Sequence, residues 1–328
     1  MSVLSIRDLC VTFPTPLGDL RAVRGVSLDV EMGELMGVVG ESGSGKSVTF
    51  LAAMGLLPQK ARITGSVTVD GQELIGASQK VIRSVRGKSL AMIFQDPLSA
   101  LNPVHRVGDQ IVEMIQAHSS TTDAEAMKRA VELLDIVGIP QPDERAHQYP
   151  HEFSGGMRQR VVIAMAIAND PKVLIADEPT TALDVTVQAQ ILEVIQRIQE
   201  RFGTAVVLIT HDLGVIARVA HRVNVLYAGR NVERATVDEL FSRPTHPYTH
   251  GLLASLPHEG QSRLTPITGF PPNMLTPPPG CGFAPRCSFA RPECDAAVPD
   301  MLQVGSSWSS CIRANDIAVE MGKAGGRG

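Results

Sequence analysis

Residues 40–47 read GESGSGKS, and they follow the apolar run LMGVV at residues 35–39. This is the pattern G-x4-G-K-[ST], in which a strand leads through a glycine-rich loop into a helix. Successive glycines let the backbone turn its N–H groups inward around an anion, and the helix that follows adds the positive end of its dipole. The stretch therefore predicts a phosphate-binding loop between a strand and a helix.

The last two residues of this loop have the chemistry that a nucleotide needs. Lys46 can reach the β- and γ-phosphate oxygens as a mobile charge, and the Ser47 hydroxyl is placed to bind Mg²⁺. A chance match is the alternative, and the surrounding pattern argues against it. We expect a nucleotide and Mg²⁺ as ligands. The predicted contacts in the loop are Gly40, Ser42, Gly43, Gly45, Lys46 and Ser47.

The composition limits the class of protein. The chain has 328 residues, enough for one large domain with an appendage or for two ordinary domains, and its formal net charge is −4. No excess of basic residues favours nucleic acid as the main ligand. The longest apolar stretch, residues 161–168, is far shorter than the roughly 20 residues that span a bilayer. We expect a cytosolic chain that reaches a membrane only through partner proteins.

The order of the expected elements indicates an α/β fold. Short alternating runs over residues 3–29 predict antiparallel strands, and residues 97–168 change to helical spacing, as in an inserted helical segment. Strand, helix and strand then alternate, which implies a parallel sheet. We expect further strands at residues 66–69, 173–176, 205–210 and 223–227, and helices at residues 107–117, 122–137, 157–168 and 185–201.

Two carboxylates follow the apolar strand at residues 173–176. The carboxyl end of a parallel strand is where such a sheet presents residues to a ligand. Asp177 can hold Mg²⁺, directly or through water, and Glu178 can deprotonate the attacking water as a general base. Alone, the pair could equally cap a helix. Together with the phosphate loop, it favours hydrolysis.

Two further polar residues end predicted strands. His211 follows the strand at residues 205–210, where its imidazole could contact the γ-phosphate and the attacking water, although a lone histidine is more often structural. Gln95 follows the run at residues 91–94, just where the helical segment begins. Its amide could contact Mg²⁺ and water while its backbone connects to the insertion.

A second anion-binding feature opens the last helix of the insertion, at residues 153–159 with the sequence FSGGMRQ. Ser154 is a natural N-cap, and Gly155 and Gly156 expose the first N–H groups of the helix. One chain does not need two phosphate sites for a single nucleotide. We therefore expect a dimer in which this helix end meets the nucleotide held by another subunit.

The ordered set of these motifs, with ALD at residues 182–184, resembles the ATP-binding subunit of ATP-binding-cassette (ABC) transporters over residues 1–255. The resemblance implies that Phe13 stacks on adenine, Asp184 lies at the dimer contact and His211 is the switch histidine. It likewise implies that Lys46 and Ser47 hold phosphates and Mg²⁺, that Glu178 is the base and that Gln95 couples the site to membrane subunits.

The match departs from the family at one position. The family signature usually reads L-S-G-G-Q, whereas residues 153–157 read FSGGM. Because Ser154 and both glycines remain, we expect the signature still to function in meeting the nucleotide of another subunit.

The tail resembles the C-terminal extension of oligopeptide and dipeptide importers, through HPYT at residues 246–249 and the cysteine-containing run CGFAPRC at residues 281–287. The resemblance implies a related second ATPase, two transmembrane permeases, an extracytoplasmic solute-binding protein and a place on the cytoplasmic face of the inner membrane. Alternatives are another cargo, such as a glutathione-like peptide or a nickel complex, or a soluble ABC ATPase without a transporter.

The expected architecture combines these parts. It is an α/β P-loop ATPase core with an antiparallel β subdomain, an inserted helical subdomain and a small Cys/Pro-rich C-terminal extension. The predicted nucleotide-binding domain covers residues 1–255, with its helical insertion at about residues 96–170, and the extension covers residues 256–328.

Four of the five cysteines lie in the extension, at Cys281, Cys287, Cys294 and Cys311. In a cytosolic chain they are expected as thiols or metal ligands, and four thiolates could surround one centre. The resemblance points to a [4Fe-4S] cluster, with Zn²⁺ and free thiols as the alternatives. Cys10, within an apolar alternation, is expected as a small buried residue.

Overall fold

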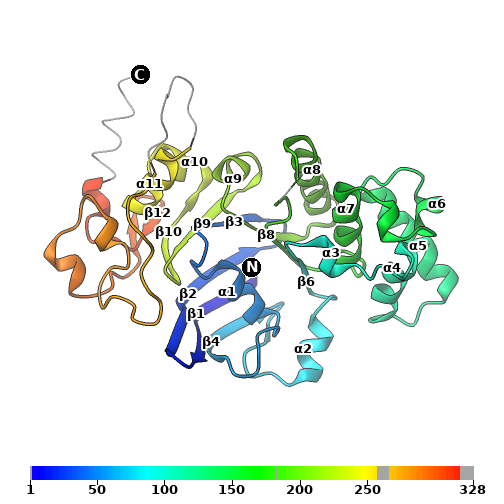
Figure 1. The fold of residues 1–328 in the computed structure, drawn as a ribbon, viewed down its shortest axis with the longest axis horizontal. Helices are drawn as coiled ribbons and strands as arrows, with labels where there is room; N and C mark the ends of the chain where they lie inside the picture. The colour runs from blue at the N-terminus through cyan, green and yellow to red at the C-terminus, as the bar shows by residue number, and fades with distance from the viewer. Residues whose placement is uncertain (1, 182, 257–265, 318–328) are drawn as a thin grey trace. The chain divides into compact units, whose positions relative to one another are not determined.

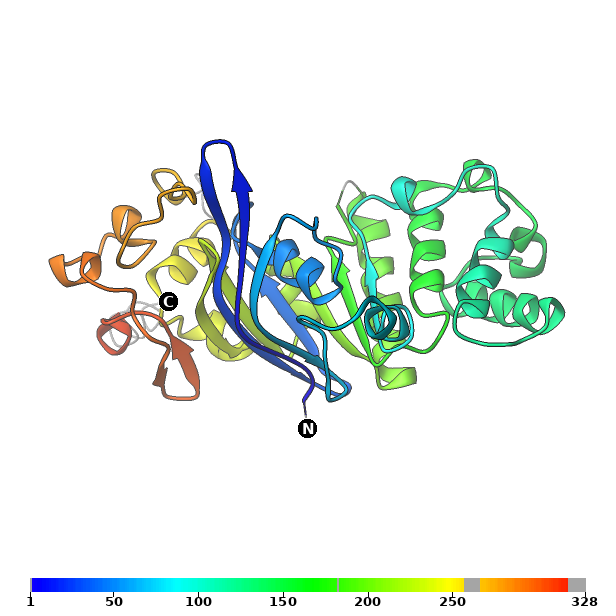
Figure 2. The same cartoon turned by 90° about the horizontal axis from the view of Figure 1, so that it is seen from below.

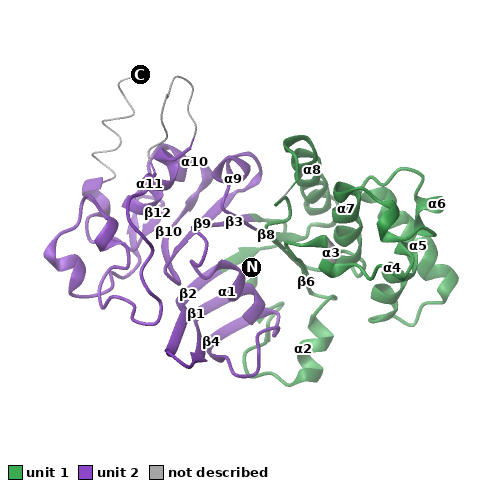
Figure 3. Cartoon of the chain, viewed as in Figure 1, with its two compact units in different colours: residues 1–4, 29–35, 68–208 green, residues 5–28, 36–67, 209–328 purple. Residues whose placement is uncertain are grey.

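The structure of the protein is a computed structural model, and it describes residues 2–181, 183–256 and 266–317. The chain divides into two compact units (Figure 3). Unit 1 comprises residues 1–4, 29–35 and 68–208, and unit 2 comprises residues 5–28, 36–67 and 209–328. Each unit thus draws on segments that are far apart in the sequence.

Unit 2 contains most of the antiparallel sheet that the sequence predicted. Strand β1 (Ser2–Thr15) and strand β2 (Gly18–Glu31) form a long hairpin, which Figure 2 shows at its full length, and β1 also borders β4 (Arg62–Val69). Apolar side chains alternate along β2, with Val26, Leu28 and Val30 all buried, as a sheet with one covered face requires.

A second sheet region of unit 2 supports the phosphate loop. Strand β3 (Leu35–Val39) is buried at every residue and pairs in parallel with β9 (Arg222–Tyr227). Strand β10 (Arg230–Thr236) continues the sheet antiparallel to β9, and the extension adds β12 (Ser307–Ser309) and β11 (Leu302–Val304). The helices of this unit, visible in Figure 1, are α1 (Lys46–Ala53), α9 (Leu213–Val219), α10 (Val237–Ser242) and α11 (Pro247–Ala254).

Unit 1 contains the parallel strands that carry the predicted carboxylates. Strand β6 (Leu90–Ile93) pairs in parallel with β7 (Val173–Asp177), and the first residues of β8 (Ala205–Thr210) lie on the other side of β7. All five residues of β7 are buried. Helix α8 (Val185–Phe202) follows β7, and α2 (Gln79–Val85) precedes β6.

The predicted helical insertion is present in unit 1. Helix α5 begins at a capping box in which Thr122 and Glu125 satisfy each other's backbone N–H groups. The helices pack closely at Gly108, where an added Cβ would lie only 2.8 Å from the carbonyl oxygen of Ala146. The insertion consists of α3 (Pro97–Ala100), α4 (Val107–Gln116), α5 (Asp123–Ile136), α6 (Pro142–Ala146), the short helix η1 (Pro150–Glu152) and α7 (Gly155–Ala166).

Within the described part of the chain, every helix is too short or too polar to cross a bilayer.

Candidate nucleotide site

The phosphate loop depends on glycine at two positions. Gly40 and Gly45 have φ angles of 152° and 95°, a backbone region that favours glycine. A Cβ on Gly40 would lie 2.1 Å from the carbonyl oxygen of Leu226, and one on Gly45 would lie 2.7 Å from that of Ala22. The two glycines therefore let the loop pass close to neighbouring backbone and turn into α1.

Lys46 is the first residue of α1, and its side chain is buried within the loop. Its Nζ donates to the carbonyl oxygens of Gly40 at 2.7 Å and Glu41 at 3.1 Å. The Ser44 hydroxyl is buried and has no hydrogen-bond partner among the described residues. A buried cation, an unpaired hydroxyl and a helix N-terminus suit the oxyanions of a phosphate chain, so the loop fits ATP.

The carboxylate edge of unit 1 brings two predicted residues together. Asp177 is buried at the end of β7, and Glu178 follows it with a φ angle of 47°. The Gln95 side-chain amide donates to Oε2 of Glu178 at 3.3 Å, and Thr181 Oγ1 donates to the same oxygen at 2.9 Å. The Glu178 carboxylate is thus oriented by two side chains from different elements. Its role as a base stays a prediction.

Two helix N-termini in unit 1 are capped, one at Ser154 as predicted and one at Asp184, for which the sequence predicted a dimer contact and not a cap. Ser154 caps α7, whose first residues are Gly155 and Gly156, and Asp184 caps α8 through a 2.9 Å bond from the N–H of Val187. Ser154, Gly155 and Asp184 are all exposed. These residues therefore offer polar groups at the surface of unit 1. Ala182 of the 182–184 motif lies outside the described residues.

The remaining predicted nucleotide residues lie in unit 2. His211 is exposed directly after β8, and its neighbour Asp212 caps α9. Phe13 is half-buried near the end of β1. Their contacts with adenine and γ-phosphate stay predictions.

A contact that the sequence did not predict ties the phosphate loop to the extension. The Arg286 guanidinium pairs with both carboxylate oxygens of Glu41, at 2.7 and 3.0 Å. The hydroxyl of Tyr248 accepts from the Glu41 N–H at 2.7 Å. Hydrogen bonding to Glu41 raises the pKa of Arg286, and desolvation raises the pKa of Tyr248. The backbone N–H and the side chain of Glu41 are thus both bound by residues beyond position 240 of the sequence.

Aromatic side chains surround this contact. The ring of Tyr227 lies 4.5 Å from that of Tyr248 and 5.3 Å from that of Phe283, distances at which aromatic pairs attract each other. Arg286 also donates to the Tyr227 hydroxyl at 3.2 Å. The HPYT and CGFAPRC runs contain Tyr248, Phe283 and Arg286, so they were the available signal for this packing.

The four cysteines of the extension line one cavity of about 20 Å³. Desolvation raises the pKa of Cys281 and Cys287, and it raises the pKa of Cys311 to about 11. No group of three or more His, Cys, Asp or Glu side chains in the described ranges could hold a metal ion. The cavity has room for about one water, so as arranged the thiols do not fit a four-iron cluster. Cys10, predicted as buried, is half-buried on β1.

Comparison with known proteins decides the family. The model for ABC transporters matches residues 23–181, and the model for the C-terminal region of oligopeptide/dipeptide transporters matches residues 232–294. The chain is 51% identical over 310 residues to the oligopeptide transport ATP-binding protein OppD of Bacillus subtilis, covering 93% of this chain and 87% of OppD. This chain belongs to the family of ABC transporter ATP-binding proteins for oligopeptides and dipeptides.

Other members and solved structures agree with this assignment. The chain is 52% identical to the dipeptide transport ATP-binding protein DppD of Bacillus subtilis, with 90% of each covered. A dimeric ATP-binding cassette in a post-hydrolysis state, bound to ADP and Pi, matches with a TM-score of 0.64 and 26% identity, over 71% of this chain and 98% of the other. The predicted family and the α/β ABC ATPase fold class are confirmed.

Proposed function

We propose that this ABC ATP-binding protein binds and hydrolyses ATP to power the import of dipeptides or oligopeptides across the cytoplasmic membrane. The observation that carries the proposal is the complete phosphate loop, with Lys46 buried at the start of α1. This chain is also 51% and 52% identical to two peptide-transport ATP-binding proteins, which match 93% and 90% of its length. Another cargo, such as a glutathione-like peptide or a nickel complex, is the alternative.

The proposed chemistry uses the residues that the motifs predicted. Lys46 would bind the phosphates and Ser47 the Mg²⁺, while Asp177 and Gln95 would complete the magnesium site. Glu178 would take a proton from the attacking water, and this role is supported by the hydrogen bonds from Gln95 and Thr181 that hold its carboxylate. His211 would stabilise the γ-phosphate.

The proposed cycle requires a second ATPase subunit. We expect Ser154, Gly155, Gly156 and Asp184 to face a nucleotide held by that subunit, in which case ATP would favour the closed dimer. The exposure of both capped helix ends and the dimeric state of the solved cassette support this arrangement. The further partners would be two permeases and an extracytoplasmic solute-binding protein, with the chain held peripherally at the cytoplasmic face.

The division into residues 1–255 and 256–328 stays a proposal, and so does the centre at the four cysteines. The proposed centre is a [4Fe-4S] cluster, with Zn²⁺ as the alternative. Thiolate chemistry supports it, whereas the cavity of about 20 Å³ is too small for the cluster, so binding would require the segment to rearrange. Iron, sulfide and zinc analysis after anaerobic purification tests this. A chain that contains none of the three would overturn the assignment.

The decisive experiment compares Glu178→Gln with Glu193→Gln, an exposed substitution on α8. In membranes that contain the complete transporter, Glu178→Gln should keep ATP binding and lose hydrolysis by about 10²- to 10⁴-fold. The Glu193 variant should behave as the native chain does. Uptake of labelled dipeptides, tested against nickel and glutathione, identifies the cargo. Normal hydrolysis by Glu178→Gln would refute the proposed base.

A further inference from the structure

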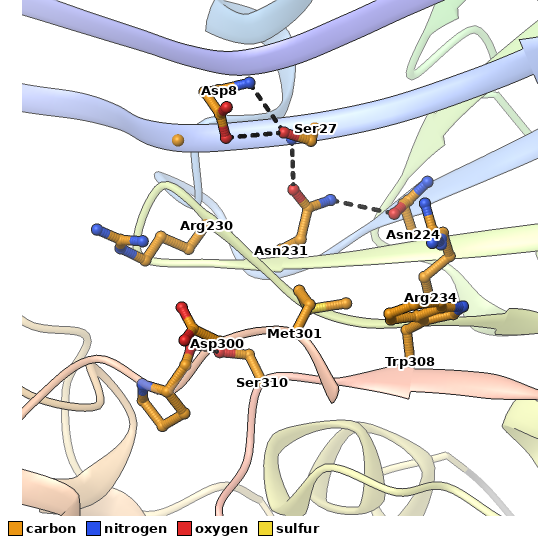
Figure 4. A pocket seen from close by; sticks show the side chains of 12 residues that line it. Asp8, Ser27, Asn224, Arg230, Asn231, Arg234, Asp300, Met301, Trp308 and Ser310 are labelled. Atoms are coloured by element: carbon orange, nitrogen blue, oxygen red, sulfur yellow. Dashed lines mark hydrogen bonds between the residues drawn. The ribbon is translucent and has the colours of Figure 1, made fainter. Parts of the chain in front are cut away.

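Unit 2 contains a cavity of about 340 Å³ that lies outside the phosphate loop (Figure 4). Its walls come from the hairpin of β1 and β2, from β9 and β10, and from residues 299–310 of the extension. The volume falls within the range of small-molecule sites, about 300–1,000 Å³. None of the motifs that predicted nucleotide binding lines it.

One wall of the cavity is a connected set of polar side chains. Asn231 accepts from the N–H of Ser27 at 2.8 Å and donates to Asn224 at 3.0 Å. The Ser27 hydroxyl donates to Asp8 at 3.3 Å. Asn224 and Asn231 are buried, and buried amides with their partners in place form a rigid surface. This wall is therefore built before any ligand arrives.

Arg230 has an unsatisfied donor at the cavity. Its Nε is buried and has no hydrogen-bond partner among the residues that the structure describes, a state that carries a desolvation penalty. The positive charge of Arg24 lies nearby. Desolvation by burial lowers the pKa of Arg24 most, and repulsion by Arg230 lowers it further. A ligand carboxylate in the cavity would bring the opposite charge close to these two guanidinium groups.

The remaining charges narrow the ligand class. Arg234 also lines the cavity, with its guanidinium 5.3 Å from the ring centre of Trp308. Asp8 and Asp300 line it too, so the cavity has two acidic and two basic side chains. A ligand with only negative charge would be repelled by the carboxylates, and a ligand with only positive charge would be repelled by the guanidinium groups. A ligand with one charge of each sign avoids both penalties.

We propose that this cavity binds a small zwitterion with a free ammonium and a free carboxylate group, an amino acid or a short peptide. Arg230 binds the carboxylate and Asp300 the ammonium, since one oxygen of Asp8 already accepts from Ser27. Apolar atoms of the ligand pack against Met301 and Trp308, which also line the cavity; in the view of Figure 4, Met301 lies between Asp300 and Trp308. The proposal does not rest on the transport function.

Calorimetry on the full chain, with the phosphate loop saturated by MgADP, tests the proposal. The probes are alanyl-alanine, its N-acetyl derivative, its C-terminal amide, free alanine and inorganic phosphate. We expect alanyl-alanine or alanine to bind, and each blocked derivative to bind at least about tenfold more weakly, because one charged contact is lost. The comparison of alanine with alanyl-alanine separates an amino acid from a peptide as the ligand.

Variants assign the binding to this cavity. Arg230→Gln and Asp300→Asn should each weaken binding about tenfold or more, whereas Arg218→Gln and Asp135→Asn, exposed substitutions elsewhere, should leave it unchanged. Thermal unfolding shows whether each variant is folded. If one is not, the binding of the two blocked probes to the native chain tests the proposal instead. No binding at millimolar concentration, equal binding of the blocked probes, or competition by phosphate alone would overturn the proposal.

Discussion

Arg286 and Glu41 form a bidentate ion pair, at 2.7 and 3.0 Å, across 245 positions of the chain. Glu41 is the second residue of the phosphate loop, and Arg286 precedes Cys287 in the extension. The side chain of Arg286 is 5% exposed and that of Glu41 is 26% exposed, so water screens the pair little. The cysteine-containing segment is therefore fastened directly to the loop that would hold the phosphates.

Arg286→Met should weaken both stability and nucleotide binding. It leaves Glu41 partly buried without its cation, and because Glu41 retains some exposure we expect a loss of about 2 kcal/mol in the free energy of unfolding. The KM for ATP should rise, since the loop carries an uncompensated negative charge next to its phosphates. Urea unfolding and steady-state kinetics measure the two effects.

The double variant Glu41→Gln, Arg286→Met is the control for this prediction. It removes both charges, so it should recover part of the lost stability, and the coupling energy follows from the double-mutant cycle. Strictly additive effects would show that the pair does not stabilise the loop.

Tyr248→Phe should have a smaller effect on the same loop. It removes the hydroxyl that accepts from the Glu41 N–H at 2.7 Å, and an unsatisfied backbone donor costs about 1–3 kcal/mol when buried. Here the donor is partly buried, so we expect about 1 kcal/mol by urea unfolding. Tyr227→Phe is the matched control. It removes a tyrosine hydroxyl from the same cluster, while Glu41 keeps its bonds to Tyr248 and to Arg286. Equal stability of Tyr248→Phe and the native chain would contradict the prediction.

Local patterns predicted the core of the nucleotide site. The phosphate loop, the strand before it and the cap at Ser154 each depend on residues within a few positions of one another, and they occur as expected. Gln95 and Glu178 meet although they are 83 positions apart, because each follows the end of one of two paired parallel strands. Sheet geometry made this pairing predictable.

The individual contacts made by the extension could not be predicted from the sequence, although its HPYT and CGFAPRC runs marked the segments that make them. Strands β11 and β12 have three residues each, too few for alternation to indicate a strand. The partner of Arg286 depends on where the whole extension packs, which no local pattern encodes. The arginine and aspartate residues of the cavity, likewise, come from three separate segments and match no motif.

The two signature glycines should respond differently to alanine. A Cβ on Gly156 would lie 2.6 Å from Cγ1 of Val187, whereas one on Gly155 would meet only Leu183, at 3.9 Å. Val is stiff, so Gly156→Ala should destabilise unit 1 by about 1–3 kcal/mol. Gly155→Ala should leave stability unchanged, yet it should lower ATPase activity if this helix end meets the partner's nucleotide. A Gly155→Ala variant with native activity would argue against that dimer contact.

Acid should destabilise the protein through His246. This ring is buried, and desolvation lowers its pKa to about 3. The unfolded chain binds a proton near pH 6.5 and the folded chain does not, so the stability from His246 is complete above pH 6.5 and is lost progressively between pH 6.5 and 3. At pH 5 the loss should reach about 2 kcal/mol.

His246→Asn isolates this effect, because the asparagine oxygen can still accept from the Tyr248 N–H at the start of α11. Burial raises the pKa of Glu233, whose carboxylate accepts from the N–H of His246, and this acts in the opposite direction above pH 4.5. Urea midpoints of the native chain and the variant, at pH 7.5 and pH 5, should therefore be compared with each other. The native midpoint should fall further than that of the variant, and parallel declines would show that His246 does not control acid stability.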